Sequence, residues 1–430
     1  MDSKAIKVPC KNENCGKLIL EATAKKTGGY CYPCYNAIEA EKREEYIRKN
    51  RRDVNLYEGV EDPVEIIKIM HKDKKYDPLI TYIDYPKTKE EVYEVLTNDG
   101  VEKLKKYAME LYKNNDNQWE SILLHLVCFK AADINEILKV LIREDKIYEP
   151  SLFKNADDEI AELLIEKLNN INESVSVNHV LLSLSMIGNE RVVELFNKWK
   201  MNEPEFSTKL YCKPHNYCFE AGWKLDDNGK RKNLYYKKSY GIKEGTPPKN
   251  TPVNFYEKHD EKCQWCGKNL SSLFTIDLHN EDMKFLGFTG DKLSISTCVE
   301  CAAYYPVLTD IDTKGNVSWS EYNEKRDDVD IEEDDDEYEE NIENKQVYID
   351  CTERTENYAA NEFLDVKFTK IGGMPTCIND AYYPKCPKCG EEMVFVGQVS
   401  GEDFEDYAEG IYYGFVCKDC MIAATTYDQT

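Results

Sequence analysis

Twelve cysteines in three groups of four are the feature that most constrains how this chain can fold. The groups follow the spacings C-x4-C-x15-C-x2-C, C-x2-C-x31-C-x2-C and C-x2-C-x27-C-x2-C. Two pairs of thiolates separated by an insert suit tetrahedral zinc, because each pair places two sulfurs about 2.3 Å from one ion. The spacing therefore predicts three Zn2+ sites, with the ligands Cys10, Cys15, Cys31 and Cys34; Cys263, Cys266, Cys298 and Cys301; and Cys386, Cys389, Cys417 and Cys420.

A glycine follows the leading pair of cysteines in each group, at Gly16, Gly267 and Gly390. Glycine permits the positive φ with which the backbone folds back, so that its N–H groups reach the ligand sulfurs. Four thiolates also close the coordination sphere, whereas a catalytic zinc keeps one position open. We therefore expect three structural sites; redox C-x-x-C motifs and buried free thiols are the alternatives.

One further segment is a candidate for an open metal site. Cys212, His215 and Cys218 place three soft ligands within seven residues, and a fourth would come from Cys351, Cys377 or His259. The chain lacks HExxH, GxxxxGK[ST] and GxSxG motifs, and it has no GxGxxG after a strand. The prediction is accordingly a protein without catalytic or cofactor-binding residues beyond the zinc ligands, and the alternative is a metal-dependent hydrolase that uses this segment.

The pattern along the chain predicts an α+β multidomain fold. Residues 1–52 form a zinc ribbon followed by a charged helix, and residues 60–203 form a helical, HEAT-like domain. Its clearest helical segments are 119–129, 134–143, 160–168, 177–187 and 191–199. A β-rich zinc-ribbon region over 204–320 and a C-terminal β-rich zinc-binding domain over 347–430 complete the expected order. The expected strands are 234–236, 293–297, 346–349, 393–399 and 411–416.

Two breaks in this pattern have a clear physical meaning. Gly188 and Asn189 separate two amphipathic segments, as the left-handed turn of a helical hairpin does. Residues 321–346 hold 14 acidic and 3 basic side chains. Such a segment buries too little apolar surface to order itself, so we expect a solvated, disordered linker or loop.

Charge and hydropathy limit the partners of the chain. Its formal net charge is −25, which argues against nucleic acid and anionic lipid as partners, although Lys25, Lys26, Arg51 and Arg52 are locally basic. No apolar run approaches the roughly 20 residues of a membrane span. The N-terminus lacks the features of a signal peptide, so we expect a cytoplasmic protein whose cysteines stay reduced. The sequence leaves the oligomeric state open.

Several stretches resemble known families. Ile371-Gly372-Gly373-Met374-Pro375, the Cys-Pro-Lys-Cys-Gly run at 386–390 and residues 393–399 resemble the pattern of bacterial YwqG-like proteins. The same arrangement is similar to the C-terminal domain of the programmed cell death protein 2 family, and the resemblance covers residues 370–430. It implies a chaperone that holds a basic ribosomal protein, by analogy with the eukaryotic relatives.

Two other stretches resemble bacterial proteins. The element from Ala22 to Cys34 is similar to one at the start of bacterial proteins near toxin and immunity loci, and Ala221 to Tyr236 resembles a segment of bacterial zinc-ribbon proteins with helical repeats. These resemblances imply an immunity-type binding protein. Together with the acidic charge, they lead to the expectation of a zinc-stabilised module that captures a basic protein partner.

Overall fold

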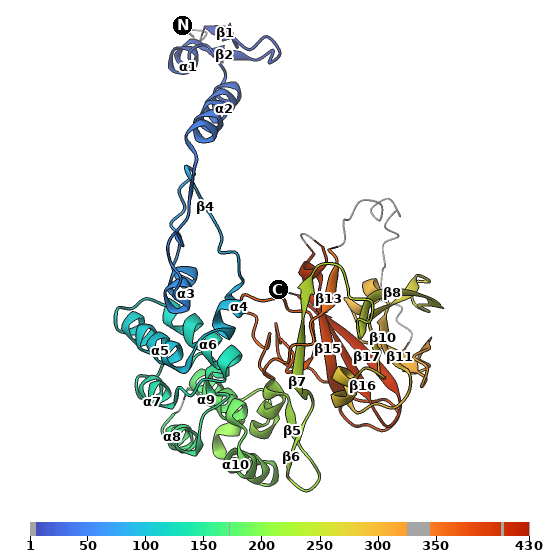
Figure 1. The fold of residues 1–430 in the computed structure, drawn as a ribbon. Helices are drawn as coiled ribbons and strands as arrows, with labels where there is room; N and C mark the ends of the chain where they lie inside the picture. The colour runs from blue at the N-terminus through green and yellow to red at the C-terminus, as the bar shows by residue number, and fades with distance from the viewer. Residues whose placement is uncertain (1–5, 172, 325–344, 406–407, 430) are drawn as a thin grey trace. The chain divides into compact units, whose positions relative to one another are not determined.

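The computed structural model describes residues 6–171, 173–324, 345–405 and 408–429 (Figure 1). The chain divides into two compact units, Met1–Lys87 and Thr88–Thr430. The division lies inside the region 60–203 that the sequence pattern treats as one helical domain, so that helix α3 (Pro63–His71) belongs to the first unit. Most of the acidic segment 321–346 lies outside the described residues.

The first unit begins with a short hairpin and two helices. Strands β1 (Lys7–Pro9) and β2 (Leu18–Leu20) pair antiparallel, and α1 (Glu21–Thr27) and α2 (Tyr32–Asn50) follow. Helix α2 buries none of its side chains, as expected for a helix that is charged on every face. Strands β3 (Arg52–Val54) and β4 (Ile80–Tyr82) then pair in parallel on either side of α3 in the sequence.

Among the described residues, the second unit opens with seven α-helices, in which α4 and α5 pack on α6, α7 packs on α8, and α8, α9 and α10 pack on one another. Helix α6 is the most deeply buried of these, with eight buried side chains. Gly188 ends α9 with φ 51°, and the Asn189 side chain accepts a hydrogen bond from the Val192 N–H at the start of α10, which confirms the predicted turn. The helices are α4 (Lys89–Glu94), α5 (Asn98–Lys113), α6 (Gln118–Lys130), α7 (Asn135–Arg143), α8 (Asp158–Leu168), α9 (Ser174–Ile187) and α10 (Glu190–Met201).

An eight-stranded antiparallel sheet forms most of the rest of this unit, with the order β12-β11-β17-β16-β15-β14-β7-β13. Strands from 204–320 and from 347–430 therefore pair within one sheet, although the sequence pattern treats these regions separately. The strands are β7 (Tyr236–Glu244), β11 (Val307–Ile311), β12 (Val317–Trp319), β13 (Val347–Ile349), β14 (Lys370–Gly373), β15 (Val394–Ser400), β16 (Ile411–Cys417) and β17 (Ile422–Asp428).

A second, three-stranded sheet packs against this one through the main hydrophobic core. Its order is β10-β9-β8, and the Phe274 ring of its central strand lies against Gly414 of the large sheet. A Cβ at Gly414 would lie 2.8 Å from the Phe274 ring, so only glycine permits this close approach. The remaining elements are β5 (Trp223–Leu225), β6 (Arg231–Asn233), β8 (Val253–Lys262), β9 (Asn269–Asp277), β10 (Lys292–Thr297) and α11 (Val299–Ala302).

The fold is thus of the mixed α+β class that the sequence predicts, with a helical middle region and a β-rich C-terminal region. Within the described ranges, no helix combines the length and the apolar character that crossing a bilayer requires.

Candidate metal centres

The structure gathers each of the three predicted cysteine quartets into one cluster. Within every cluster the four sulfurs lie within 4.8 Å of one another. Individual Sγ–Sγ distances are 3.5 Å for Cys15 and Cys31, 3.4 Å for Cys266 and Cys298, and 3.6 Å for Cys389 and Cys417. Four sulfurs bound at about 2.3 Å to one tetrahedral ion would lie about 3.8 Å apart. The clusters are therefore close to the size that one bound metal ion requires.

The first pair of cysteines in each cluster lies on a tight backbone turn. The Cys263 N–H donates to the Lys268 carbonyl at 2.9 Å, and the Cys386 N–H donates to the Glu391 carbonyl at 2.8 Å. In the first cluster the Cys10 N–H donates to a carbonyl seven residues later, because two more residues separate its cysteines. The glycines that follow these pairs have φ of 62°, 81° and 77°, as predicted for Gly16, Gly267 and Gly390.

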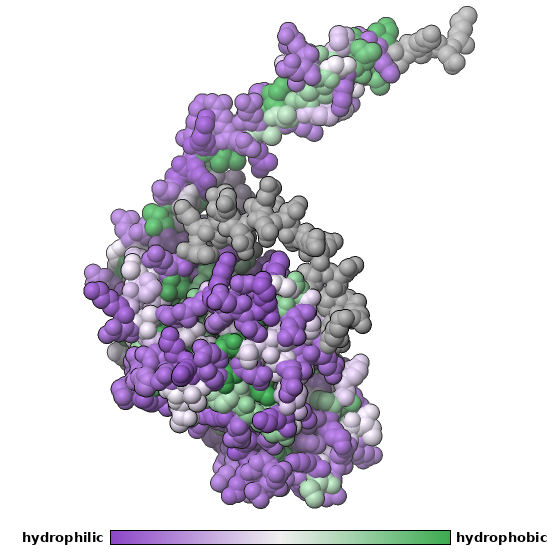
Figure 2. Space-filling model, turned by 90° about the vertical axis from the view of Figure 1, so that its right-hand side faces the viewer, coloured by the Kyte–Doolittle hydropathy of each residue, from purple (hydrophilic) through white to green (hydrophobic). Residues whose placement is uncertain are grey.

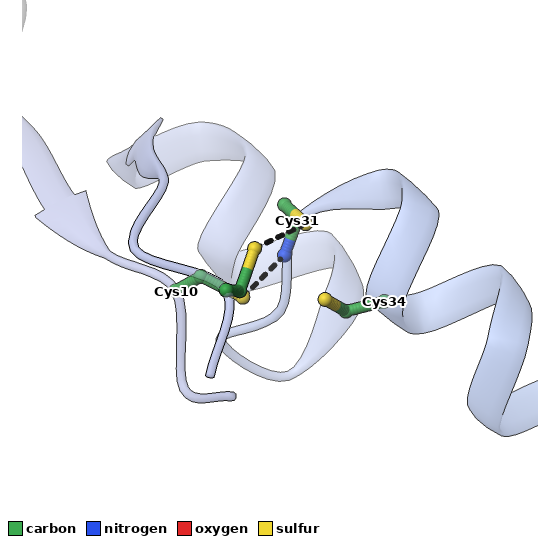
Figure 3. A group of neighbouring side chains, drawn as sticks. Cys10, Cys31 and Cys34 are labelled. Atoms are coloured by element: carbon green, nitrogen blue, oxygen red, sulfur yellow. Dashed lines mark hydrogen bonds between the residues drawn. The ribbon is translucent and has the colours of Figure 1, made fainter. Parts of the chain in front are cut away.

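The second pair of cysteines begins a helix in two of the clusters. Cys31 is the N-cap of α2, and Cys298 is the N-cap of α11. Unpaired N–H groups at a helix N-terminus favour a neighbouring negative charge, so this position suits thiolate ligands. Figure 3 shows the Cys31 and Cys34 side chains at the start of α2 and the Cys10 side chain opposite them.

The third cluster is built differently, from two similar turns. The Met421 N–H donates to the Cys417 carbonyl at 2.8 Å, and the Gly390 N–H donates to the Cys386 carbonyl at the same distance. Met421 has φ 53°, in the left-handed region that Gly390 also occupies. Cys417 ends β16 and pairs with the first residue of β17, so this centre closes the turn between two central strands.

One thiol in each cluster has a lowered pKa. The Cys31 N–H donates to the Cys10 sulfur at 3.2 Å and lowers the pKa of that thiol to about 7. The Glu391 N–H lowers the pKa of Cys389, and a hydrogen bond from Cys298 lowers that of Cys263. The thiolate is the form that binds metal, so these are the thiols that ionise most readily in each cluster. The pKa of a second thiol is raised in each, by hydrogen bonds with Cys31 for Cys34 and with Cys263 for Cys298, and by burial for Cys417.

The candidate open site near residue 212 is not assembled in the same way. Cys212 is exposed, whereas Cys218 is buried. Over the part of the chain that the structure describes, the three quartets are the groups of metal-ligating side chains that lie close enough to hold an ion. The hydrolase interpretation therefore gains no support from the geometry of Cys212, His215 and Cys218.

Sequence reasoning missed the most unusual polar side chain of the large sheet, Lys370 of β14. This lysine is fully buried, and its Nζ donates to the backbone carbonyls of Tyr358, Ala359 and Met374. Burial lowers the pKa of Lys370 well below its usual value, while the three acceptors favour the ammonium form, which alone has three N–H groups to donate. The sequence feature that could have pointed to this residue is a lysine directly before the apolar Ile371-Gly372-Gly373 run.

The fold and these clusters define a protein of mixed α+β architecture with three four-cysteine centres suited to metal binding. The chain is 34% identical to the uncharacterized protein YpfL of Salmonella typhimurium over 440 aligned positions, which cover 99% of each protein. It belongs to the same family as that protein.

Two other comparisons give no match. No family model matches the chain, so its resemblance to the YwqG-like and programmed cell death protein 2 families stays a prediction. No solved structure matches it either.

Proposed function

We propose that the protein binds three structural zinc ions and serves as a binding protein for a basic protein partner. The observation that carries the proposal is the completeness of the three donor sets, each of four thiolates. Four thiolates fill the tetrahedral coordination of Zn2+ and leave no position for a substrate or an activated water. The metal would therefore stabilise the fold, and the function would lie in the protein surface.

Zinc is the metal that fits these centres best. Soft thiolate ligands in tetrahedral groups select Zn2+ or iron–sulfur clusters, and each of the three quartets encloses the space of one ion. A zinc ion with four thiolates carries a charge of −2, so three centres add about six negative charges to the formal net charge of −25. Metal binding would thus make the protein more negative and strengthen its electrostatic attraction for a basic partner.

The surface charge supports a basic partner. Lys224 Nζ contacts Glu391 at 2.8 Å and Glu392 at 2.5 Å, and Lys139 Nζ likewise contacts two carboxylates. Because such lysines are already paired and acidic residues outnumber basic ones by 81 to 56, the remaining carboxylates determine the field around the protein. Hydrophilic residues dominate the face that Figure 2 shows. Such a field accelerates association with a basic protein.

The biological role that suits this chemistry is capture of a basic protein, as an immunity-type or chaperone-like protein does. The test is affinity capture with the zinc-loaded chain, followed by titration of the purified captured protein at increasing salt. We expect a stoichiometric partner with a basic isoelectric point and a dissociation constant that rises steeply between about 50 and 200 mM salt. A stoichiometric partner that is acidic, or binding that is insensitive to salt, would overturn the proposal.

A further inference from the structure

The C-terminal end of the large sheet carries a small cavity that the metal centres do not use. The cavity has a volume of about 210 Å3, below the roughly 300 to 1,000 Å3 of sites for drug-sized ligands. Tyr413 and Phe415 alternate along β16 and so line it from one face of the sheet, and Thr426, which pairs with Tyr413, lines it from β17. The segment from Pro375 to Tyr383 closes it.

The lining of this cavity is aromatic and acidic. Rings of Tyr382, Tyr383 and Tyr427 join those of β16, and Asp380 and Asp428 supply carboxylates. No lysine, arginine or histidine is among the described residues that line it. Aromatic faces and carboxylates both attract cations, and their combination is typical of sites that recognise ammonium and guanidinium groups.

Contacts hold this lining in place. The Asn379 side chain donates to the Asp428 carboxylate at 2.5 Å, and the Tyr427 hydroxyl donates to the Glu409 carbonyl at 3.0 Å. The Tyr383 hydroxyl is buried without a hydrogen-bond partner among the described residues, and it lies beside Gly222, which is not among the residues that line the cavity.

A third carboxylate lies next to the cavity. Burial raises the pKa of Glu220, and the negative charge of Asp380 raises it further, although the Ala381 N–H donates to this carboxylate and opposes the shift. A cation that bound near Asp380 would therefore favour the ionised form of Glu220 as well.

We infer that this cavity binds the side chain of a lysine or arginine that the basic partner inserts. The inference rests on the proposed function, since it names the point at which that partner is recognised. A flexible alkyl stem would pack along the rings of Tyr413 and Phe415, and its charged end would lie between Asp380 and Asp428.

The test uses the full zinc-loaded chain and two small probes. Nα-acetyl-lysine methylamide carries the ammonium group, and Nα-acetyl-norleucine methylamide has the same stem without the charge. Saturation-transfer NMR and calorimetric titration measure their binding to the wild type and to the variants Asp380→Asn and Asp428→Asn. Asp260→Asn, at an exposed position of β8, is the matched control.

We expect the lysine probe to bind about tenfold more tightly than the norleucine probe and to lose about tenfold in affinity in either cavity variant but not in Asp260→Asn. Equal binding of the two probes, or cavity variants that bind like the wild type, would overturn the inference. Binding of spermidine without binding of the lysine probe would also overturn it, because the cavity would then serve a free polyamine.

The same variants separate this inference from the proposed function. If the captured basic partner binds Asp380→Asn and Asp428→Asn as it binds the wild type, the cavity is not its recognition site, while the proposed function stands. If no basic partner is captured but the lysine probe binds in the cavity, the proposed function fails and cation binding by the cavity remains.

Discussion

Replacing Lys370 by methionine tests whether a buried ammonium group joins the loop at 358–359 to the sheet. Its Nζ donates to the carbonyls of Tyr358, at 2.8 Å, Ala359 and Met374. Methionine keeps a similar length and volume but cannot donate a hydrogen bond. The variant Lys370→Met therefore removes three hydrogen bonds without opening a large cavity.

The loss of stability in Lys370→Met depends on whether each of the three carbonyls keeps another hydrogen-bond donor. The Ala359 carbonyl keeps a donor, because the Thr376 hydroxyl also bonds to it. The carbonyls of Tyr358 and Met374 lose the lysine, and each buried acceptor left without a donor costs about 1 to 3 kcal/mol. Removing a buried charge offsets part of this loss, so we expect the free energy of unfolding to fall by about 3 kcal/mol.

The assay is urea unfolding of the zinc-loaded protein, followed by tryptophan fluorescence. The matched control is Lys367→Met, which removes the same charge from a lysine that is 38% exposed and pairs with Glu244 at 2.6 Å. An exposed pair of this kind contributes about 0 to 1 kcal/mol. If Lys370→Met is no less stable than Lys367→Met, the reasoning about the buried hydrogen bonds is refuted.

Three further predictions concern the metal centres and a buried histidine. Cys389→Ser should remove one zinc ion per chain, whereas Cys351→Ser, outside the clusters, should keep all three in native mass spectrometry; equal metal content in both variants would contradict the assignment. Gly390→Ala should lower the free energy of unfolding by about 1 to 2 kcal/mol, because its φ of 77° disfavours any residue with a Cβ; an unchanged urea midpoint would count against this reasoning. Burial lowers the pKa of His125 to about 4. As the pH falls from 6.5 to 4, this histidine therefore binds a proton in the unfolded chain but not in the folded chain. The free energy of unfolding should therefore decrease as the pH is lowered through this window. His125→Phe should reduce this decrease by up to about 1.4 kcal/mol per pH unit in urea unfolding; parallel curves for the two proteins would show that His125 has no part in it.

Local chemistry made the metal centres predictable from the sequence. Cysteine spacing sets the donors, and the positive φ of Gly267 and Gly390 follows from the turn that brings a pair of thiolates to one ion. The hairpin at Gly188 was predictable for the same reason, since a left-handed residue between two amphipathic segments ends one helix before the next begins.

Some elements could not be delimited from their local pattern. Helix α5 lies within the helical region expected over 60–203 but is not one of its clearest segments, because it buries only Gly100, Leu104 and Ala108. Strand β8 lies at the edge of the small sheet and ends in the charged run from Glu257 to Lys262, which reads as a solvated segment. Both elements are stabilised by the surfaces on which they pack rather than by their own sequence.

The strand order depends on contacts between distant parts of the chain. β7 lies between β13 and β14, which follow it by more than 100 residues. Burial of both faces of the large sheet selects this order, and the sequence of β7 alone does not show which strands pair with it. The acidic aromatic cavity was hidden for the same reason, because Asp380 and Asp428 meet only when β17 and the segment from 375 to 383 have folded together.

The most direct test of this account is the number of metal ions held by the purified chain. Native mass spectrometry of protein from zinc-supplemented cells, before and after mild chelation, should show three zinc ions that resist the chelator. A fourth ion that is lost easily would point to an open site near Cys212, His215 and Cys218. A chain that holds no metal would contradict the assignment of all three clusters and the structural role given to them.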